Sequence, residues 1–254
     1  MILRRVHPEP PQVLECDASD ARAQLLEWYR PPNHEWLRLN LVATVNGSAA
    51  GKDGTSETIT SAMDRRILGV IRELSDVVLV GAASVRSEGY QLPKMSRLAV
   101  VTATGDLSGH RIDPDAGERL IVICPIAVVG IIRAQFAEAL ILSPENDNHY
   151  SAAPVDPMDI MALLRGNGFA SIVCEGGPRL ATQLVNAGLV DELCLTTSAL
   201  LTSARLPIFA TPDPAAAGTE NSLELTQLVI DESSSLYARW AFSRDGSEAR
   251  QAKT

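Results

Sequence analysis

The tetrapeptide Glu175-Gly176-Gly177-Pro178 is the strongest local indication of chemistry in this sequence. It follows an apolar run typical of a buried strand and precedes a segment with helical spacing. Glycines let a backbone approach a ligand closely, and proline fits the first position of a helix without loss of a hydrogen bond. The free amides and the positive dipole end of such a helix would attract a pyrophosphate, and the alternative is an ordinary strand–helix turn.

Two other turns of small residues follow predicted strands in the same way. One is residues 81–85 (GAASV), continued by residues 86–90 (RSEGY), and the other is residues 44–48 (TVNGS). Ligands of α/β proteins bind outside the carboxyl ends of the strands. Each turn taken singly is typical of a plain loop, but three turns placed alike predict one shared crevice.

The ionisable residues near these turns differ in how much they indicate. Glu175 lies between a buried strand and two glycines, which favours a functional role over simple solvation. Arg72 sits beside Glu73 in a predicted helix, where a solvated ion pair is the default, and Glu88 is by default a surface charge. No Ser-His-Asp set or Gly-x-Ser-x-Gly elbow indicates hydrolysis.

The elements that would position these residues alternate between strands and helices. Short continuous apolar runs predict strands buried on both faces, at residues 76–81, 98–102, 120–124 and 171–174. An alternating pattern predicts a strand at residues 36–45. Apolar residues at helical spacing predict helices at residues 61–74, 131–140, 156–164 and 178–187, the first capped by Ser61 with Asp64 in its first turn. This order predicts an α/β fold with a mostly parallel sheet.

The two ends of the chain read differently. Residues 193–197 predict another strand, and residues 223–230 and 236–242 predict an antiparallel hairpin at the edge of the sheet. We expect a surface loop at residues 202–221. The predicted domain covers residues 33–243, between an N-terminal extension (1–32), whose only element is a helix at 20–29, and a polar tail (244–254).

Composition excludes several classes of protein. The chain has 254 residues, of which 46% are hydrophobic and 21% charged, and its net charge of −9 argues against a nucleic-acid partner. The four cysteines form no Cys-x-x-Cys pair, so we expect no metal site. No apolar stretch approaches the ~20 residues of a membrane span, and no signal peptide is evident. A reduced, cytoplasmic protein is expected.

Four segments in order carry a resemblance to a known family: LNLVATVNG, TITSAMDRRILGVIRELSD, VVLVGAASV and IVCEGGPRLATQLVNAGLVDEL. Residues 36–242 resemble the reductase domain of bacterial riboflavin-biosynthesis deaminase/reductases, which has a dihydrofolate-reductase-like fold. The resemblance implies NADPH-dependent reduction of 5-amino-6-(5-phosphoribosylamino)uracil: the sugar opens to an imine, which hydride reduces to a ribitylamino group. It also implies a homodimer, for which we expect the apolar C-terminal hairpin to supply the interface.

The resemblance assigns roles to residues that match the family's motifs. Cofactor-binding positions are Val42, Gly47, Thr58, Gly81, Ser84, Val85, Thr102, Gly176, Gly177, Pro178, Arg179 and Leu180. Substrate-binding positions are Ser56, Arg72, Leu92, Lys94 and Glu175, with Ser56 and Arg72 at the phosphate. Glu88 and Asn46 take the catalytic positions, and no residue is assigned to a metal.

The sequence also departs from the family's pattern. Thr44-Val45-Asn46-Gly47-Ser48 stands where the family has Ser-Leu-Asp-Gly-Lys, and Glu88-Gly89-Tyr90 replaces its Asp-Asp-Pro. Residues 102–104 lack the arginine that favours NADPH over NADH, and the zinc motif of the deaminase is absent. A pteridine reductase of the dihydrofolate type and a catalytically inactive nucleotide-binding relative therefore stay open as alternatives.

Overall fold

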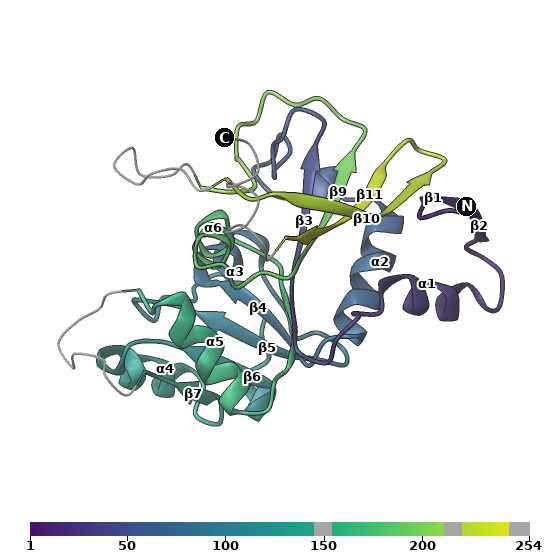
Figure 1. Ribbon diagram of the computed structural model, residues 1–254. Coiled ribbons are helices and arrows are strands. Elements are labelled where there is room, and N and C mark those ends of the chain that lie inside the picture. The colour runs from purple at the N-terminus through teal and green to yellow at the C-terminus, as the bar shows by residue number, and fades with distance from the viewer. Residues whose placement is uncertain (145–153, 211–219, 244–254) are drawn as a thin grey trace, which may run out of the picture.

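The computed structural model describes residues 1–144, 154–210 and 220–243. An eleven-stranded sheet runs through it in the order β2-β1-β10-β11-β9-β3-β8-β4-β5-β6-β7 (Figure 1). The strands are β1 (Ile2–His7), β2 (Gln12–Glu15), β3 (Trp36–Thr44), β4 (Val77–Gly81), β5 (Arg97–Val101), β6 (Leu120–Ile123), β7 (Leu140–Leu142), β8 (Ser171–Cys174), β9 (Glu192–Ser198), β10 (Leu223–Asp231) and β11 (Leu236–Phe242). The α-helices are α1 (Ala21–Tyr29), α2 (Ala62–Glu73), α3 (Ala82–Glu88), α4 (Val129–Gln135), α5 (Pro157–Gly166) and α6 (Pro178–Asn186).

The strands from β9 to β7 in this order are parallel, and their apolar sequences follow from burial on both faces. One face packs on α1, α2, α3 and α4, and the other packs on α5 and α6. The helices that connect parallel strands cover both faces of the sheet. Successive side chains of a strand point to opposite faces, so both are shielded from water. The predicted α/β class, with a mostly parallel sheet, is confirmed.

Helix α2 forms for the reasons that its sequence indicates. Ser61 caps it by accepting a hydrogen bond from the Asp64 amide at 3.0 Å. Met63, Ile67 and Ile71 are buried against the sheet. The remaining faces carry charges, among them Arg72 near the C-terminal end of the helix. Because α2 packs on the sheet in this way, the Arg72 side chain can extend to the residues that follow β8.

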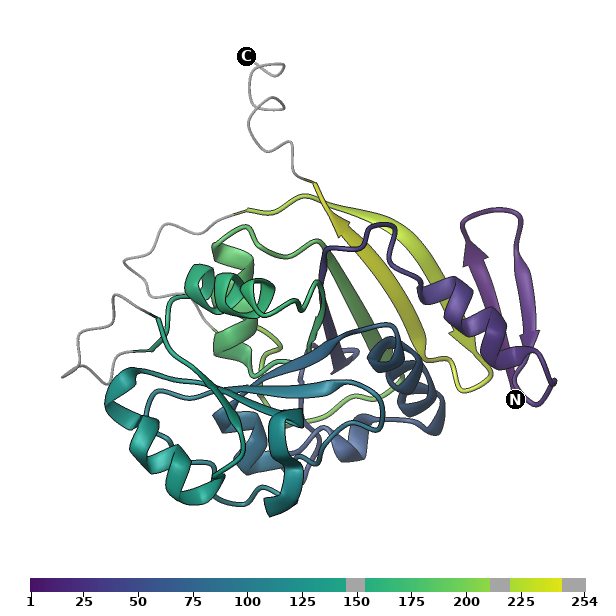
Figure 2. The same ribbon diagram turned by 90° about the horizontal axis from the view of Figure 1, so that it is seen from below.

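The antiparallel part of the sheet contains the predicted hairpin and more. The β10–β11 turn is closed by Asp231, whose Oδ1 accepts from the amides of Ser233 at 2.8 Å and Ser235 at 2.9 Å. The hairpin is not at the edge, however, because β1 pairs with β10 and β2 pairs with β1. The prediction that residues 1–32 hold only a helix is therefore wrong (Figure 2).

Two other expectations need correction. Residues 82–88, predicted as a loop, form the short helix α3, which ends at Gly89 with a left-handed φ of 61°. The helix predicted at 131–140 ends at Gln135, because Phe136 and Ala139 pack in the core as a turn leading to β7. The tail 244–254 and residues 211–219 of the predicted loop lie outside the described residues.

A buried ionic cluster joins α1 to the middle of the sheet. Glu192 on β9 lies between Arg38 on β3 and Arg239 on β11; it binds Arg38 Nε, and it accepts from Arg239 Nε at 2.7 Å. Arg38 Nη2 also donates to the Tyr29 carbonyl at 2.8 Å, and Arg239 to that of Trp28, at the C-terminal end of α1. Two cations thus satisfy carbonyls that a helix end leaves unpaired.

Candidate active site

The carboxyl ends of β8 and β4 lie side by side, because these neighbouring strands are parallel and Leu79 pairs with Cys174, whereas β3, whose Leu39 also pairs with Cys174, continues five residues further to Thr44. The Gly81 amide donates to the Gly176 carbonyl at 3.0 Å, which joins the turns after β4 and β8. A Cβ on Gly177 would lie only 3.1 Å from Ser84 Oγ. The structure thus brings together two of the three turns that the sequence singled out.

The turn after β8 has the backbone conformation that its glycines predict. Gly176 and Gly177 have φ values of +95° and +54°, in the left-handed region. Pro178 opens α6, whose first intrahelical bond runs from the Ala181 amide to the Gly177 carbonyl at 3.1 Å. The amides of Arg179 and Leu180 come before that bond, and within the described residues no acceptor outside the helix binds them.

The turn after β3 lies further along the strand direction, where β3 pairs only with β9, and it contacts a different segment. Asn46 Oδ1 accepts from Thr44 Oγ1 at 2.9 Å, and Asn46 Nδ2 donates to the Thr202 carbonyl at 2.8 Å. Gly47 is left-handed with a φ of 82°. A hollow of about 370 Å³ opens here, lined by Asn46, Gly47, Ser48, Ala204, Arg205, Leu206 and Pro207. Asn46 therefore holds the 200–207 segment, and its predicted catalytic role stays a prediction.

Arg72, Glu175 and Tyr90 form the central polar group of the site. Arg72 Nε and Nη2 each donate to one oxygen of Glu175 at 2.6 Å, and Tyr90 Oη donates to Glu175 Oε2 at 3.0 Å. The Glu175 side chain is only 5% exposed, whereas that of Arg72 is 28% exposed. The default expectation for Arg72, a solvated ion pair, is wrong, because its partner Glu175 is buried, while the neighbouring Glu73 pairs with Arg22.

The electrostatics of this group follow from burial and from the Glu175 carboxylate. Burial alone would lower the pKa of Arg72, but the hydrogen bonds and charge of Glu175 outweigh it and raise that pKa. Burial, and then the negative charge of Glu175, raise the pKa of Tyr90 well above its ordinary value. Arg72 stays cationic and Tyr90 stays a hydrogen-bond donor at neutral pH.

Glu88 and Ser56 lie together at the C-terminal end of α3. The Ser56 amide and hydroxyl both donate to the Glu88 carboxylate at 3.1 Å. Thr58, another predicted cofactor residue, donates to Asp53 Oδ1 at 2.8 Å. The structure therefore joins a predicted catalytic residue to a predicted substrate residue, in an exposed position.

The remaining predicted residues lie at varying depths. Val85 is fully buried and Leu180 is 5% exposed, so neither side chain is open to a ligand in this structure. Thr102 is 3% exposed and accepts from the Gly105 amide at 3.0 Å. Leu92 packs on the core, and Val42 is half-buried. Lys94 and Arg179 are exposed.

Two further residues belong to this region and were missed from the sequence. Tyr90 is one, because a tyrosine in a short loop gives no sign of its partner. The other is Asp64, interpreted only as a first-turn helix residue, which is 7% exposed and accepts from Thr196 Oγ1 at 2.6 Å. Its place among the apolar residues of α2 was the signal that could have revealed it.

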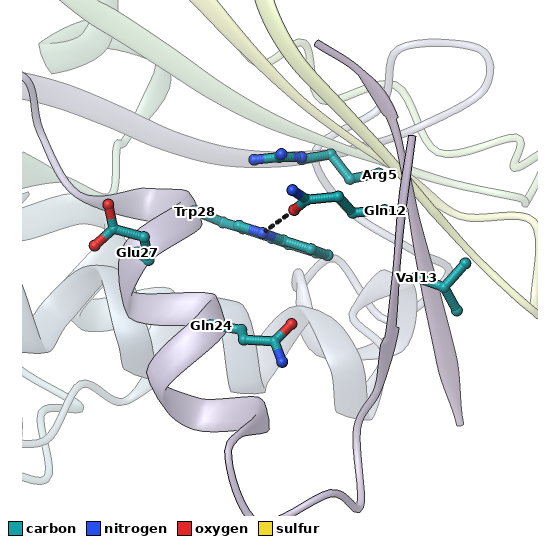
Figure 3. A pocket seen from close by; sticks show the side chains of 6 residues that line it. All are labelled: Arg5, Gln12, Val13, Gln24, Glu27 and Trp28. Atoms are coloured by element: carbon teal, nitrogen blue, oxygen red, sulfur yellow. Dashed lines mark hydrogen bonds between the residues drawn. The ribbon is translucent and has the colours of Figure 1, made fainter. Parts of the chain in front are cut away.

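A larger hollow, of about 520 Å³, lies away from these strand ends, among β1, β2 and α1 (Figure 3). Arg5 lies over the Trp28 ring at 5.2 Å from its centroid, and Trp28 Nε1 donates to Gln12 Oε1 at 3.0 Å. These contacts hold the N-terminal hairpin to α1. We therefore place the candidate site at the strand ends and not in this hollow.

Together these features define an α/β domain whose candidate site lies at the carboxyl ends of its central parallel strands. The model of the RibD C-terminal domain family matches residues 35–228, and the chain belongs to that family. The riboflavin biosynthesis protein RibD of Corynebacterium ammoniagenes is 26% identical over 186 residues, which are 69% of this chain and 46% of that protein. The chain thus spans about half the length of the curated relatives it matches.

Solved structures share the fold. A pyrimidine reductase-like protein of Corynebacterium diphtheriae superposes with a TM-score of 0.70 at 20% identity, covering 88% of this chain and 99% of that one. The riboflavin biosynthesis reductase of Saccharomyces cerevisiae gives a TM-score of 0.62 at 15% identity, covering 87% and 98%. The predicted family and fold class are confirmed. No helix of the described residues is long and apolar enough to cross a membrane.

Proposed function

We propose that this chain is an NADPH-dependent reductase of 5-amino-6-(5-phosphoribosylamino)uracil in riboflavin biosynthesis. The observation that carries the proposal is that two complementary features directly follow the same strand, β8. Glu175, which binds Arg72 and Tyr90, comes directly after the last residue of β8, and the glycine turn that would hold a pyrophosphate begins at the very next residue, Gly176. Membership of the RibD C-terminal domain family supports the same activity.

The residues present fit a dinucleotide cofactor. Gly176 and Gly177 leave a cradle that side chains would fill, since a Cβ on Gly176 would lie 3.2 Å from Leu41 Cδ2. The amides at the start of α6 would hold the pyrophosphate. When bound, NADPH supplies the hydride that reduces the imine carbon of the opened sugar. The protein's share is to bind and orient the two partners and to keep water away.

The choice of NADPH over NADH gains support from an arginine that the sequence pattern did not reveal. Arg86 on α3 donates through Nη1 to the Asp106 carbonyl at 2.8 Å, next to the segment that follows β5. Residues 102–104 lack an arginine of their own, and Arg86, which also lies 3.7 Å from Asp106 Oδ2, would be a cation for a 2′-phosphate there. Arg86 is partly exposed and can turn toward a ligand.

The proposed function is tested by incubating the purified protein with NADPH and the phosphoribosylaminouracil. We expect NADPH oxidation that depends on this substrate, with a product two hydrogen atoms heavier by mass spectrometry. NADPH uptake without oxidation would instead favour the inactive nucleotide-binding relative, and oxidation with dihydrofolate alone would favour the pteridine reductase. Either result overturns the proposal.

A matched pair of glycine variants tests the cofactor turn. Gly177→Ala and Gly188→Ala both place a Cβ at a positive φ, of 54° and 66°, and so carry similar backbone strain. Only Gly177 has a neighbour, Ser84 Oγ, and only Gly177 lies at the proposed pyrophosphate site. We expect Gly177→Ala to weaken NADPH binding about tenfold, or ~1.4 kcal/mol, and Gly188→Ala to leave it unchanged, by fluorescence titration. Equal affinities would remove the turn from the cofactor site.

We also propose a cytoplasmic homodimer that forms through the antiparallel part of the sheet. Trp240, Phe242 and Leu195 are only partly buried on one face, and Leu236 on β11 is 36% exposed. A contiguous apolar face of this kind suits a second copy of the same surface. Light scattering at micromolar concentration should give twice the 27.2 kDa of the chain, and a monomer mass would contradict the dimer.

A further inference from the structure

Asp64 has a buried carboxyl group, and one of its two oxygens has no hydrogen-bond donor among the described residues. Its Oδ1 accepts from Thr196 Oγ1 at 2.6 Å, and within the described ranges no residue donates to Oδ2. The described side-chain atoms that are sealed from solvent without a partner are Arg5 Nε, Ser96 Oγ and Gln227 Nε2. Since Oδ2 is not one of them, it keeps contact with solvent although the residue is 7% exposed.

The carboxyl group faces the candidate site. Val173 and Cys194 both pack in the core beneath α2, and side chains two residues further along a strand point the same way. Glu175 and Thr196 are those residues, and both do face α2, since Glu175 accepts from Arg72 and Thr196 donates to Asp64. Thr196 is also paired in register with Val42, a predicted cofactor residue.

Stability does not account for a carboxyl group here. Burial raises the pKa of Asp64, and the negative charge of Glu175 adds to this, while the Thr196 hydrogen bond and Arg65 work in the opposite direction. No cation among the described residues forms an ion pair with Asp64. An unpaired buried carboxylate costs free energy, and groups kept at such a cost cluster at functional sites.

We propose that Asp64 is a specificity-determining residue that recognises the heterocycle of the substrate. It would accept hydrogen bonds from a ring N–H and from the adjacent exocyclic N–H, with Thr196 fixing the plane of the carboxyl group. A carboxylate has four lone-pair sites, so Oδ1 can serve Thr196 and a ligand together. The substrate class is an aminopyrimidine with two neighbouring N–H donors, and the assignment rests on the function proposed above.

The chemistry discriminates between closely similar rings. In 6-aminouracil the ring N1–H and the amino N–H lie parallel, which matches the two oxygens of one carboxylate. Uracil lacks the amino group, and its other N–H is flanked by two carbonyl oxygens that a carboxylate repels. These two compounds have the same ring and differ by one amino group, so they are the probes of choice.

The test measures the dissociation constants of 6-aminouracil and uracil by ligand-observed NMR, with NADPH present at saturation. We expect the wild-type protein to bind 6-aminouracil at least tenfold more tightly than uracil. Asp64→Asn should bring the two affinities within about twofold, because an amide offers one acceptor and opposes a donor to the second N–H. Thr196→Val, which removes only the orienting hydroxyl, should reduce the ratio to a few-fold.

The control is Asp159→Asn, a change of the same type in the first turn of α5, where the residue is exposed. It should keep the full ratio. Asp64→Asn should also melt at the wild-type temperature or above it, since it removes an unpaired buried charge. A wild-type ratio near one, or a ratio that Asp64→Asn leaves intact, would overturn the proposal. NADPH oxidation with the phosphoribosylaminouracil is measured separately, so loss of the proposed function and loss of this recognition are distinguishable.

Discussion

Replacing Glu192 with glutamine is expected to lower the free energy of unfolding by about 3–5 kcal/mol, as for loss of one partner of a buried ion pair. The Glu192 side chain is 3% exposed, and those of its partners Arg38 and Arg239 are 4% and 12% exposed. Glutamine keeps the shape but not the charge. It leaves two guanidinium groups close together in the interior. Urea denaturation near pH 7 measures the difference.

The effect of this substitution should depend on pH in a defined direction. Burial alone would raise the pKa of Glu192, but Arg38 and Arg239 outweigh it and hold that pKa below its ordinary value. A lowered folded-state pKa means that the stabilisation is complete above the unfolded-state pKa of about 4.3 and disappears as the pH falls through the folded-state value. The wild-type protein and the variant should therefore converge in stability at acid pH.

Glu118→Gln is the matched control for Glu192→Gln. Glu118 is exposed, so its loss should change the free energy of unfolding by less than about 0.5 kcal/mol. If Glu192→Gln costs no more than this control, the cluster does not hold α1 to the sheet. A wild-type–variant difference that stays constant down to acid pH would contradict the charge argument.

The parts of the fold that could be predicted are those with a strong local pattern. β8 was predicted with its observed bounds, and the cap of α2 with its residue, because burial on two faces and helix capping leave direct marks in sequence. β1 could not be found this way. Its partner β10 is more than two hundred residues away, and its apolar Leu3 is followed by two arginines. Pairing of this kind is decided by tertiary context.

The candidate site shows the same contrast between features with a local sequence pattern and features that depend on distant contacts. The glycine turn of residues 176–177 could be predicted because it depends on local backbone conformation, and the structure gives both residues a positive φ. The partner of Arg72 could not, since Glu175 lies 103 residues away and a nearer Glu73 offered a simpler pair. Tyr90 and Asp64 were missed for the same reason. Their significance lies in what they contact, and those contacts are made by the fold.

Arg72→Ala is expected to weaken binding of the phosphorylated substrate by about 2–4 kcal/mol, which corresponds to roughly a thirty- to thousand-fold rise in its dissociation constant. Two terms contribute. The variant removes the guanidinium that would contact the phosphate, and it leaves Glu175, whose side chain is 5% exposed, without its bidentate partner. NADPH affinity should stay near the wild-type value, and calorimetry with each ligand measures both quantities.

Loss of the phosphate contact and loss of the Glu175 partner can be told apart by comparing the phosphorylated substrate with its dephosphorylated form. If Arg72 contacts the phosphate, Arg72→Ala abolishes the preference for the phosphorylated compound, whereas Tyr90→Phe, which removes only the 3.0 Å bond to Glu175, retains it. Glu175→Gln should then strengthen the preference, because it frees Arg72 from a neutralising carboxylate. If Arg72→Ala weakens both compounds equally, Arg72 acts by positioning Glu175, and a near-unchanged dissociation constant removes Arg72 from substrate binding altogether.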